Sequence, residues 1–387
     1  MSSQPTVQLA KPLSKKMKTH FPDSNQSLST KNFLGSDSRH IRVFTPTVSF
    51  SENQYLTCLW SSVIACGVEV QSLQFHKLIA DRRIGDVIHL HWIQDFCPLV
   101  VRQTPKTLFY TLRNLAHLSF LKAQGHQIVW TIHNTLSHGT KTPRLEHRLR
   151  WLLSRLCSDI LVMSEYSKQE FIQHYGRSDR VHIIPHGNYI GAYPNQLTQL
   201  EARQKLNIAP HKTVLLNLGR VKPYKGVEHL VEAFGQIQDS EAVLLIAGSC
   251  RDAELAEQLQ KSVQVDSRIN LHLRFIEDVE IQIYMNASDW VILPYQNILN
   301  SGSALLGLSF GRPMIVPQKG SLPELIEDGK QGITYSDDAE LASAITRALS
   351  ISPKQREQMC TQAYSAAQRY DWQQIGQQLH QIYQLSA

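Results

Sequence analysis

Residues 215–226 read LLNLGRVKPYKG and combine an apolar run, a turn and two fixed positive charges. The apolar start predicts a buried strand that ends at Gly219. Arg220 and Lys225 follow in the turn, and Gly226 precedes a helical pattern. A helix N-terminus behind a glycine-containing turn attracts anions, and guanidinium and ammonium groups add donors for phosphate oxygens. This stretch is therefore predicted to bind an anion such as a diphosphate.

Strand-like and helix-like segments alternate on both sides of this stretch. Apolar runs such as 127–132 and 242–247 predict strands that are buried on both faces, and the segments between them predict covering helices. Ligands of such sheets bind at the carboxyl ends of the strands. The pattern predicts an α/β protein with two Rossmann-like, doubly wound domains that face each other across a cleft.

The chain has 387 residues, which is too long for one ordinary core. The alternation of strand-like and helix-like segments weakens between residues 188 and 209, a stretch that contains several Gly, Pro and Gln residues. We expect a domain boundary there. The predicted organisation is a disordered basic tail at 1–39, a first Rossmann-like domain at 40–192, a linker at 193–209, a second Rossmann-like domain at 210–370 and a C-terminal helix at 371–387 that packs back on the first domain.

Composition narrows the class of protein. A hydrophobic content of 42% with 19% charged residues indicates a globular chain. The net charge of +6 suits anionic partners, but no basic run is interleaved with aromatic residues, so nucleic acid is not expected. The six cysteines are scattered without a CxxC pair, which is typical of reduced cytosolic thiols. Without a signal-peptide or membrane-spanning pattern, we expect a cytoplasmic protein whose contact with the inner face of a membrane is peripheral.

A second candidate element reads LPYQNILNSGSALLGLSFG at 293–311. A polar loop ends at Asn300, and Ser301, Gly302 and Ser303 then open a helix. Serine caps a helix N-terminus, and glycine lets backbone N–H groups approach a ligand. An ordinary capped helix is the simpler interpretation. The presence of the Arg–Lys turn in the same half favours a second phosphate contact.

Histidines mark the ends of strands in the first half. His89 and His91 alternate on one strand and share a face, but no third zinc ligand is evident, so no metal is expected. His133 and His186 each follow an apolar run. A strand-end position suits contact with a sugar or an acceptor, for which His133 is the first candidate, and a structural hydrogen bond is an equal alternative.

The order and spacing of several motifs resemble a known family. GRVKPYKG, LLIAGS, RFIEDVEIQIYMNASDWVILPY, SGSALLGLSFGRPMIV and GSLPELIEDGKQGI are similar to the donor-binding half of nucleotide-sugar glycosyltransferases of the GT-B class, family-4 group. HLHW, WTIHN, SEYSK and IIPHGNY fit the first half more loosely. The resemblance implies an acceptor side at 40–192 and nucleotide-sugar binding at 210–370.

The resemblance also implies roles for individual residues. Arg220 and Lys225 would neutralise the donor diphosphate, the leaving group, and the Ser–Gly–Ser backbone would hold its distal phosphate. Phe275 and Ile276 would lie near the base, and Glu324 near the ribose. The implied donor-binding set is Gly219, Arg220, Lys225, Phe275, Ile276, Asn300, Ser301, Gly302, Ser303 and Glu324.

One departure from the family is clear. The family has two glutamates eight positions apart, and alignment through FGRP puts Ile298 and Leu306 at those positions. Neither residue is acidic. The donor sugar and the stereochemical outcome therefore stay open.

The resemblance implies a hexosyltransferase that moves a hexose from a nucleotide-diphosphate sugar to an acceptor hydroxyl in glycan or polysaccharide synthesis. We expect retention, no metal and no cofactor, with His133, Arg220 and Lys225 as catalytic residues. A glycan or lipid-linked acceptor is expected, and the basic first half suggests an anionic membrane surface. The alternatives are an inverting enzyme with Asp95 or Glu165 as base, a non-catalytic nucleotide-sugar-binding scaffold, and an epimerase that needs no acceptor.

Overall fold

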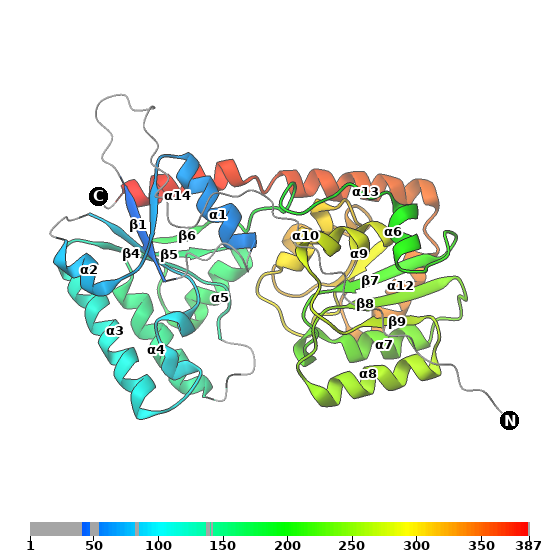
Figure 1. Ribbon diagram of the computed structural model, residues 1–387, viewed down its shortest axis with the longest axis horizontal. Helices are drawn as coiled ribbons and strands as arrows, with labels where there is room; N and C mark the ends of the chain where they lie inside the picture. Colours follow the sequence, from blue (N-terminus) through cyan, green and yellow to red (C-terminus); the bar gives the residue numbers. More distant parts are fainter. Residues whose placement is uncertain (1–40, 47–53, 82–84, 137–139, 141, 386–387) are drawn as a thin grey trace, which may run out of the picture. The chain divides into compact units, whose positions relative to one another are not determined.

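The computed structural model describes residues 41–46, 54–81, 85–136, 140 and 142–385. The tail predicted at 1–39 lies outside the described residues. The described part contains two six-stranded sheets in which all neighbouring strands run parallel (Figure 1). This arrangement confirms the predicted α/β class with two Rossmann-like domains.

The first sheet has the strand order β2-β1-β3-β4-β5-β6. Helices α2 to α5 pack on one face, and α1 and the C-terminal helix α14 pack on the other. Its strands are β1 (Arg42–Thr45), β2 (Glu69–Ser72), β3 (Val87–Leu90), β4 (Gln127–Thr131), β5 (Asp159–Val162) and β6 (Val181–Ile183). Its helices are α1 (Gln54–Ala65), α2 (Phe75–Ala80), η1 (Ile93–Asp95), η2 (Pro98–Val100), α3 (Pro105–Ala123), α4 (Pro143–Leu156) and α5 (Glu165–Tyr175).

The second sheet has the order β12-β11-β10-β7-β8-β9. Its strands are β7 (Thr213–Leu218), β8 (Ala242–Ala247), β9 (Ile269–His272), β10 (Trp290–Ile292), β11 (Met314–Pro317) and β12 (Gly332–Tyr335). Its helices are α6 (Gln199–Lys205), η3 (Pro223–Lys225), α7 (Val227–Gly235), α8 (Ala253–Val265), η4 (Asp278–Glu280), α9 (Ile281–Ala287), α10 (Gly302–Ser309), α11 (Leu322–Leu325), η5 (Asp338–Glu340), α12 (Leu341–Leu349) and α13 (Pro353–Gln368), followed by α14 (Trp372–Gln384). Among the described residues, no helix is both long and apolar enough to cross a membrane.

The second sheet changes its direction of growth between β7 and β10. β7 pairs with β8 on one side and with β10 on the other. In an open parallel sheet, the loops that leave two such strands diverge to opposite faces and leave a crevice at the carboxyl edge. The Arg–Lys turn follows β7, and the loop before α10 follows β10. The topology therefore brings both sequence motifs to one place.

The segment 193–209, predicted as a linker, contains a helix that the sequence analysis missed. Thr198 and Glu201 form reciprocal capping bonds at the start of α6. Arg203 of α6 donates to Asp289 at 2.6 Å, and both side chains are buried. Helix α2 and strand β12 were also not predicted, because they are short and lack a clear period.

Helix α14 belongs to the core of the first domain. Its residue Tyr383 is fully buried and bonds through its hydroxyl to Nδ1 of His89 at 2.7 Å. Gly376 touches α1 so closely that a Cβ there would lie 2.6 Å from the carbonyl oxygen of Ser62. The chain therefore completes the first domain with its last helix.

Tyr383→Phe should destabilise the protein. The substitution leaves Nδ1 of the buried His89 without its described partner, so we expect the free energy of unfolding to fall by about 1–3 kcal/mol. Urea denaturation measures this change. Tyr364→Phe is the matched control, because Tyr364 is 38% exposed and has no described hydrogen bond. Equal stability of Tyr383→Phe and the wild type would contradict this role of the bond.

Candidate functional site

A cavity of about 780 Å³ lies at the carboxyl ends of strands from both sheets. The first domain contributes residues that follow β3 and β4, and the second contributes residues that follow β7 and β8. This is where parallel α/β sheets place their ligands. The lining residues are His91, Trp92, Ile93, Gln94, Val100, Val101, Gln103, His133, Asn134, Thr140, Arg150, Arg220, Lys222, Tyr224 and Arg251.

The described lining of this cavity contains four cations and no carboxylate. Arg150 is neutralised, because it pairs with the buried Glu146 at 2.8 Å. Arg220, Lys222 and Arg251 have no ion pair among the described residues. Burial and the neighbouring cations lower the pKa of Lys222. The cavity therefore presents positive charge that an anionic ligand would compensate.

The Arg–Lys turn and the start of α10 converge on Gly219. Its φ of +133° is a conformation that glycine adopts without strain. A Cβ on Gly219 would lie 3.2 Å from Nζ of Lys225 and 3.7 Å from the hydroxyl oxygen of Ser303. The backbone N–H of Gln296 donates to the carbonyl of Tyr224 at 3.1 Å, which ties the two loops together. The structure thus brings the two predicted phosphate contacts side by side.

The start of α10 has the expected cap, and its first residue, Gly302, lies close to a histidine ring. The hydroxyl of Ser301 accepts from the backbone N–H of Ala304 at 3.1 Å. A Cβ on Gly302 would lie 3.3 Å from Nε2 of His186. Burial lowers the pKa of His186 to about 4, so its ring is neutral near pH 7. Backbone N–H groups at this terminus are placed as donors next to Lys225.

His133 lines the cavity and is half-buried among aromatic rings. Its ring stacks on Trp92 with centroids 4.7 Å apart, and the edge of Tyr55 lies 5.4 Å away. Nε2 of His133 lies 3.1 Å from Nδ1 of His91. Burial, together with the neighbouring ring, lowers the pKa of both His91 and His133 well below the ordinary value. The pair is therefore neutral at pH 7, and each ring has one donor and one acceptor nitrogen, of which one donor and one acceptor are used in the bond between the two rings.

His89 and His91, which share a face of β3, have different surroundings. His89 lies behind the cavity, bonded to Tyr383 and to the Thr131 hydroxyl at 2.8 Å, and burial lowers its pKa to about 3. Only His91 reaches the cavity. Within the described residues, no group of three or more His, Cys, Asp or Glu side chains is arranged to hold a metal ion.

Several predicted donor contacts lie away from the large cavity. Glu324 accepts from the backbone N–H groups of Glu165 and Tyr166, at 3.1 and 2.8 Å, and so caps α5 of the first domain. Asn300 accepts from the Ser167 hydroxyl at 2.8 Å. Asn300 and Glu324 line a smaller cavity of about 160 Å³ together with Ser301 and His186.

The two residues predicted near the base are also outside the described lining of both cavities. Phe275 is 62% exposed, and Ile276 is buried in the core of the second domain. Ile298 and Leu306, which replace the two family glutamates, are buried in the same apolar core. Two apolar side chains therefore stand where the family has two carboxylates.

Four further residues line the cavity that were not predicted from the sequence: Lys222, Arg251, Trp92 and Arg150. Lys222 lies inside the quoted turn, and Arg251 follows β8 as Arg220 follows β7. Ligands of parallel sheets bind at the carboxyl ends of the strands, and this principle, which singled out Arg220, could have singled out Arg251 as well. Arg150 has no such signal, because it sits within α4 and reaches the site only through tertiary packing.

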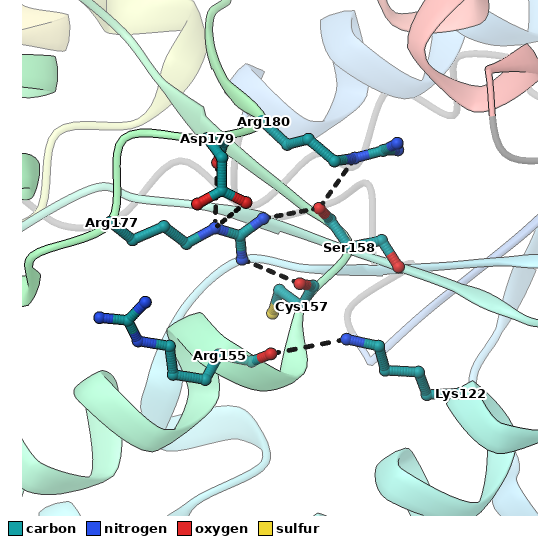
Figure 2. Close-up of a pocket in the computed structure, with 7 residues that line it drawn as sticks. All are labelled: Lys122, Arg155, Cys157, Ser158, Arg177, Asp179 and Arg180. Carbon is teal, nitrogen blue, oxygen red and sulfur yellow. Dashed lines mark hydrogen bonds and ion pairs between the residues drawn. The ribbon is translucent and has the colours of Figure 1, made fainter.

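A second basic pocket, of about 380 Å³, lies at the end of α4 (Figure 2). Its cations already have partners in the backbone. Arg177 donates to the carbonyls of Cys157 and Ser158, at 2.9 and 2.7 Å, and Lys122 donates to that of Leu156 at 2.6 Å. Arg180 pairs with Asp159. These side chains complement the carbonyl end of the helix, so this pocket is a structural cap.

Comparison with known proteins places the chain among sugar-transferring enzymes. Residues 212–350 match the family model "Glycosyl transferases group 1", and residues 75–188 match "Glycosyltransferase Family 4". The GDP-mannose:glycolipid 4-beta-D-mannosyltransferase of Xanthomonas campestris pv. campestris is 27% identical over 341 residues, which cover 86% of this chain and 88% of that protein. The D-inositol 3-phosphate glycosyltransferase of Corynebacterium aurimucosum is 26% identical over 321 residues, covering 77% and 71%.

Solved structures share the fold at low identity. Anabaena HepE in complex with UDP aligns with a TM-score of 0.68 at 19% identity, covering 89% of this chain and 99% of that one. WaaG, described as a glycosyltransferase involved in lipopolysaccharide biosynthesis, aligns with a TM-score of 0.64 at 18% identity, covering 89% and 99%. These likenesses support the two-domain architecture.

The buried histidines predict a loss of stability in mild acid. Burial holds the pKa of His89 and His186 at about 3 and about 4, against an ordinary value of 6.5. The unfolded chain therefore binds protons below pH 6.5 that the folded chain rejects. Each such histidine should lower the free energy of unfolding by about 1.4 kcal/mol per pH unit below 6.5.

Urea denaturation at several pH values between 7 and 5 measures the slope of the free energy of unfolding against pH. His186→Gln should make the slope shallower, whatever its effect at pH 7. His229→Gln changes an exposed ring and is the control that should leave the slope as it is. Stability that stays constant from pH 7 to pH 5 would contradict the neutral buried state.

Proposed function

Since this chain is a glycosyltransferase of the GT-B class and the family-4 type, we propose that it moves a hexose from a nucleotide-diphosphate sugar to an acceptor hydroxyl in the 780 Å³ cavity. The reaction needs no metal in this proposal, because protein cations and backbone N–H groups neutralise the diphosphate. The acceptor is a glycan, carried on a lipid.

One observation carries the proposal: cations without acidic partners meet a helix N-terminus where β7 and β10 end. Arg220 lines the cavity, and Nζ of Lys225 lies next to Gly219 and Ser303. Departure of a nucleoside diphosphate increases negative charge on its phosphates. Donors fixed in advance stabilise charge that grows in the transition state, without a cost of reorganisation at that moment.

Retention is the first candidate for the stereochemical outcome. The described lining of the cavity carries no Asp or Glu that could serve as a nucleophile or a base. In a retaining transfer on one face of the sugar, an oxygen of the leaving diphosphate takes the acceptor proton. His133 then contacts the sugar or the acceptor as a neutral hydrogen-bonding group.

Inversion is a second candidate, with His133 as the base instead of a carboxylate. Asp95 and Glu165 are exposed and absent from the described lining, whereas His133 lies inside it with a neutral ring. The Xanthomonas relative is named for a β-linked product, and an α-linked donor that yields a β-linked product has inverted.

The proposed acceptor class follows from the relatives. The Xanthomonas relative is named for a glycolipid acceptor, and the WaaG structure is described by its part in lipopolysaccharide biosynthesis. We assign a lipid-linked glycan to this chain by that analogy. It fits a peripheral place at the inner face of a membrane.

Arg220→Ala should lower kcat of sugar transfer on the order of 100- to 1000-fold, because it removes one preorganised charge from the leaving group. Lys225→Ala should act in the same direction. Transfer from a panel of nucleotide-diphosphate sugars measures both, and a thermal shift with each nucleoside diphosphate reports donor binding separately.

Lys354→Ala, which removes an exposed lysine of α13, is the matched control and should keep wild-type activity. Full activity of Arg220→Ala would contradict the diphosphate clamp. A wild type that binds donors but transfers to no acceptor would favour the scaffold alternative.

The configuration of the product separates the two stereochemical candidates. We expect proton NMR of the first product formed to show retention, with a pH–rate profile whose shape is unchanged in His133→Gln. An inverted product would overturn retention. His133 would then be the base if His133→Gln loses one limb of the pH–rate profile and its rate of transfer falls by about 100- to 10,000-fold.

A further inference from the structure

The outward sides of α3 and α4, here called the α3–α4 face, expose large apolar side chains. These are Leu108, Phe109, Leu112, Phe120, Trp151 and Leu152, each between 44% and 62% exposed. Leu108, Leu112 and Phe120 are spaced by four and eight residues, so they lie along one side of α3. The apolar surface therefore runs along the helix as a stripe.

Both helices belong to one layer of the first domain. Leu118 and Leu121 of α3 and Leu153 of α4 are buried in the same core cluster against the sheet. The two helices also pack on each other (Figure 1). Their opposite, exposed sides therefore form one outer surface of that layer.

The same surface is strongly basic. Residues 96–158 contain nine Lys and Arg and a single acidic residue, Glu146, and so carry more positive charge than the net +6 of the whole chain. Glu146 is buried and paired with Arg150. The exposed cations described on or next to these helices, apart from those of the cap at the end of α4, are Arg102, Lys106, Arg113, Arg144 and Arg148. None of the five has an ion pair among the described residues.

The α3–α4 face is continuous with the reaction cavity. Val101 and Gln103 line the cavity and stand just before the first residue of α3. Val101 is 70% exposed. The stripe of α3 thus starts at the mouth of the cavity.

We propose that the α3–α4 face docks on an anionic lipid bilayer and that a lipid-linked acceptor enters the cavity past Val101 and Gln103. Apolar and aromatic side chains enter the interface, while Lys and Arg meet anionic headgroups. A second copy of this chain is a poorer occupant, because a symmetric contact would place the same cations against each other. The route of the acceptor rests on the proposed function, whereas the docking does not.

Co-sedimentation of the full chain with vesicles tests the docking. The wild type should bind vesicles that contain phosphatidylglycerol and phosphatidylcholine. Its affinity for vesicles of phosphatidylcholine alone should be lower by a factor on the order of ten or more. Added salt should weaken the binding to anionic vesicles. A wild type that does not bind anionic vesicles overturns the proposal.

Two double variants locate the contact. Phe109→Ser with Leu112→Ser removes apolar surface, and Arg144→Glu with Arg148→Glu reverses charge. Each should weaken vesicle binding on the order of tenfold or more. The matched controls are Leu200→Ser with Val265→Ser and Lys205→Glu with Lys354→Glu, all exposed positions of the second domain. Equal binding by the α3–α4 variants and the controls overturns the proposal, as does self-association that the α3–α4 variants abolish while vesicles stay unbound.

Transfer assays keep this test separate from the proposed function. None of the four substituted α3–α4 residues lines the reaction cavity as described. Transfer to a water-soluble acceptor should therefore stay at the wild-type rate, and transfer to a lipid-linked acceptor in vesicles should fall. Vesicle binding without any transfer by the wild type would refute the proposed function alone. Unimpaired transfer from vesicles by the variants would refute the acceptor route alone.

Discussion

The pairing of β7 with β10 is the constraint on which the site depends. The register places Leu215 and Leu216 beside Trp290 and Val291, so the loops that leave both strands start at the same edge. Gly226 then fits against the second loop without a side chain, since a Cβ there would lie 2.1 Å from the carbonyl oxygen of Pro294. Two motifs that are about 80 residues apart in the sequence therefore lie side by side at the carboxyl edge of the sheet.

Basic residues play opposite parts in the two basic pockets of this protein. In the cap at the end of α4, Arg177 and Lys122 donate to backbone carbonyls, so their charge is used within the fold. In the reaction cavity, Arg220 and Arg251 have no such partners among the described residues. Like charges held together without acids disfavour the empty protein and favour an anionic ligand. Cations that bond to other groups of the protein therefore mark a structural site, and cations without such partners mark a candidate binding site.

The two domains are joined by chain segments that are bonded to each other. The backbone N–H of Asn188 donates to the carbonyl of Tyr370 at 2.8 Å, and the indole of Trp372 donates to the carbonyl of Asn188 at 2.6 Å. Beyond this point, α14 packs into the first domain through Gly376 and Tyr383. Glu324 adds a contact from the second domain to the start of α5. His89, which lies behind the cavity, is thus held by a helix from the C-terminal part of the chain.

The sequence by itself determined the two-domain α/β architecture and indicated a basic turn at the end of one strand. Runs such as Ala242–Ala247 are apolar on both faces, Gly219 and Arg220 follow a strand, and Ser301 caps a helix. These features can be recognised in the sequence because they are local properties of hydrophobic period and of turn and cap chemistry. Only the tertiary structure decided which residues meet. In the tertiary structure, His133 lies against His91, and His89 bonds to Tyr383. Arg150 lines the cavity, and Glu324 accepts hydrogen bonds from the start of α5. Such contacts depend on strand order and helix packing across long sequence distances, which no local pattern records.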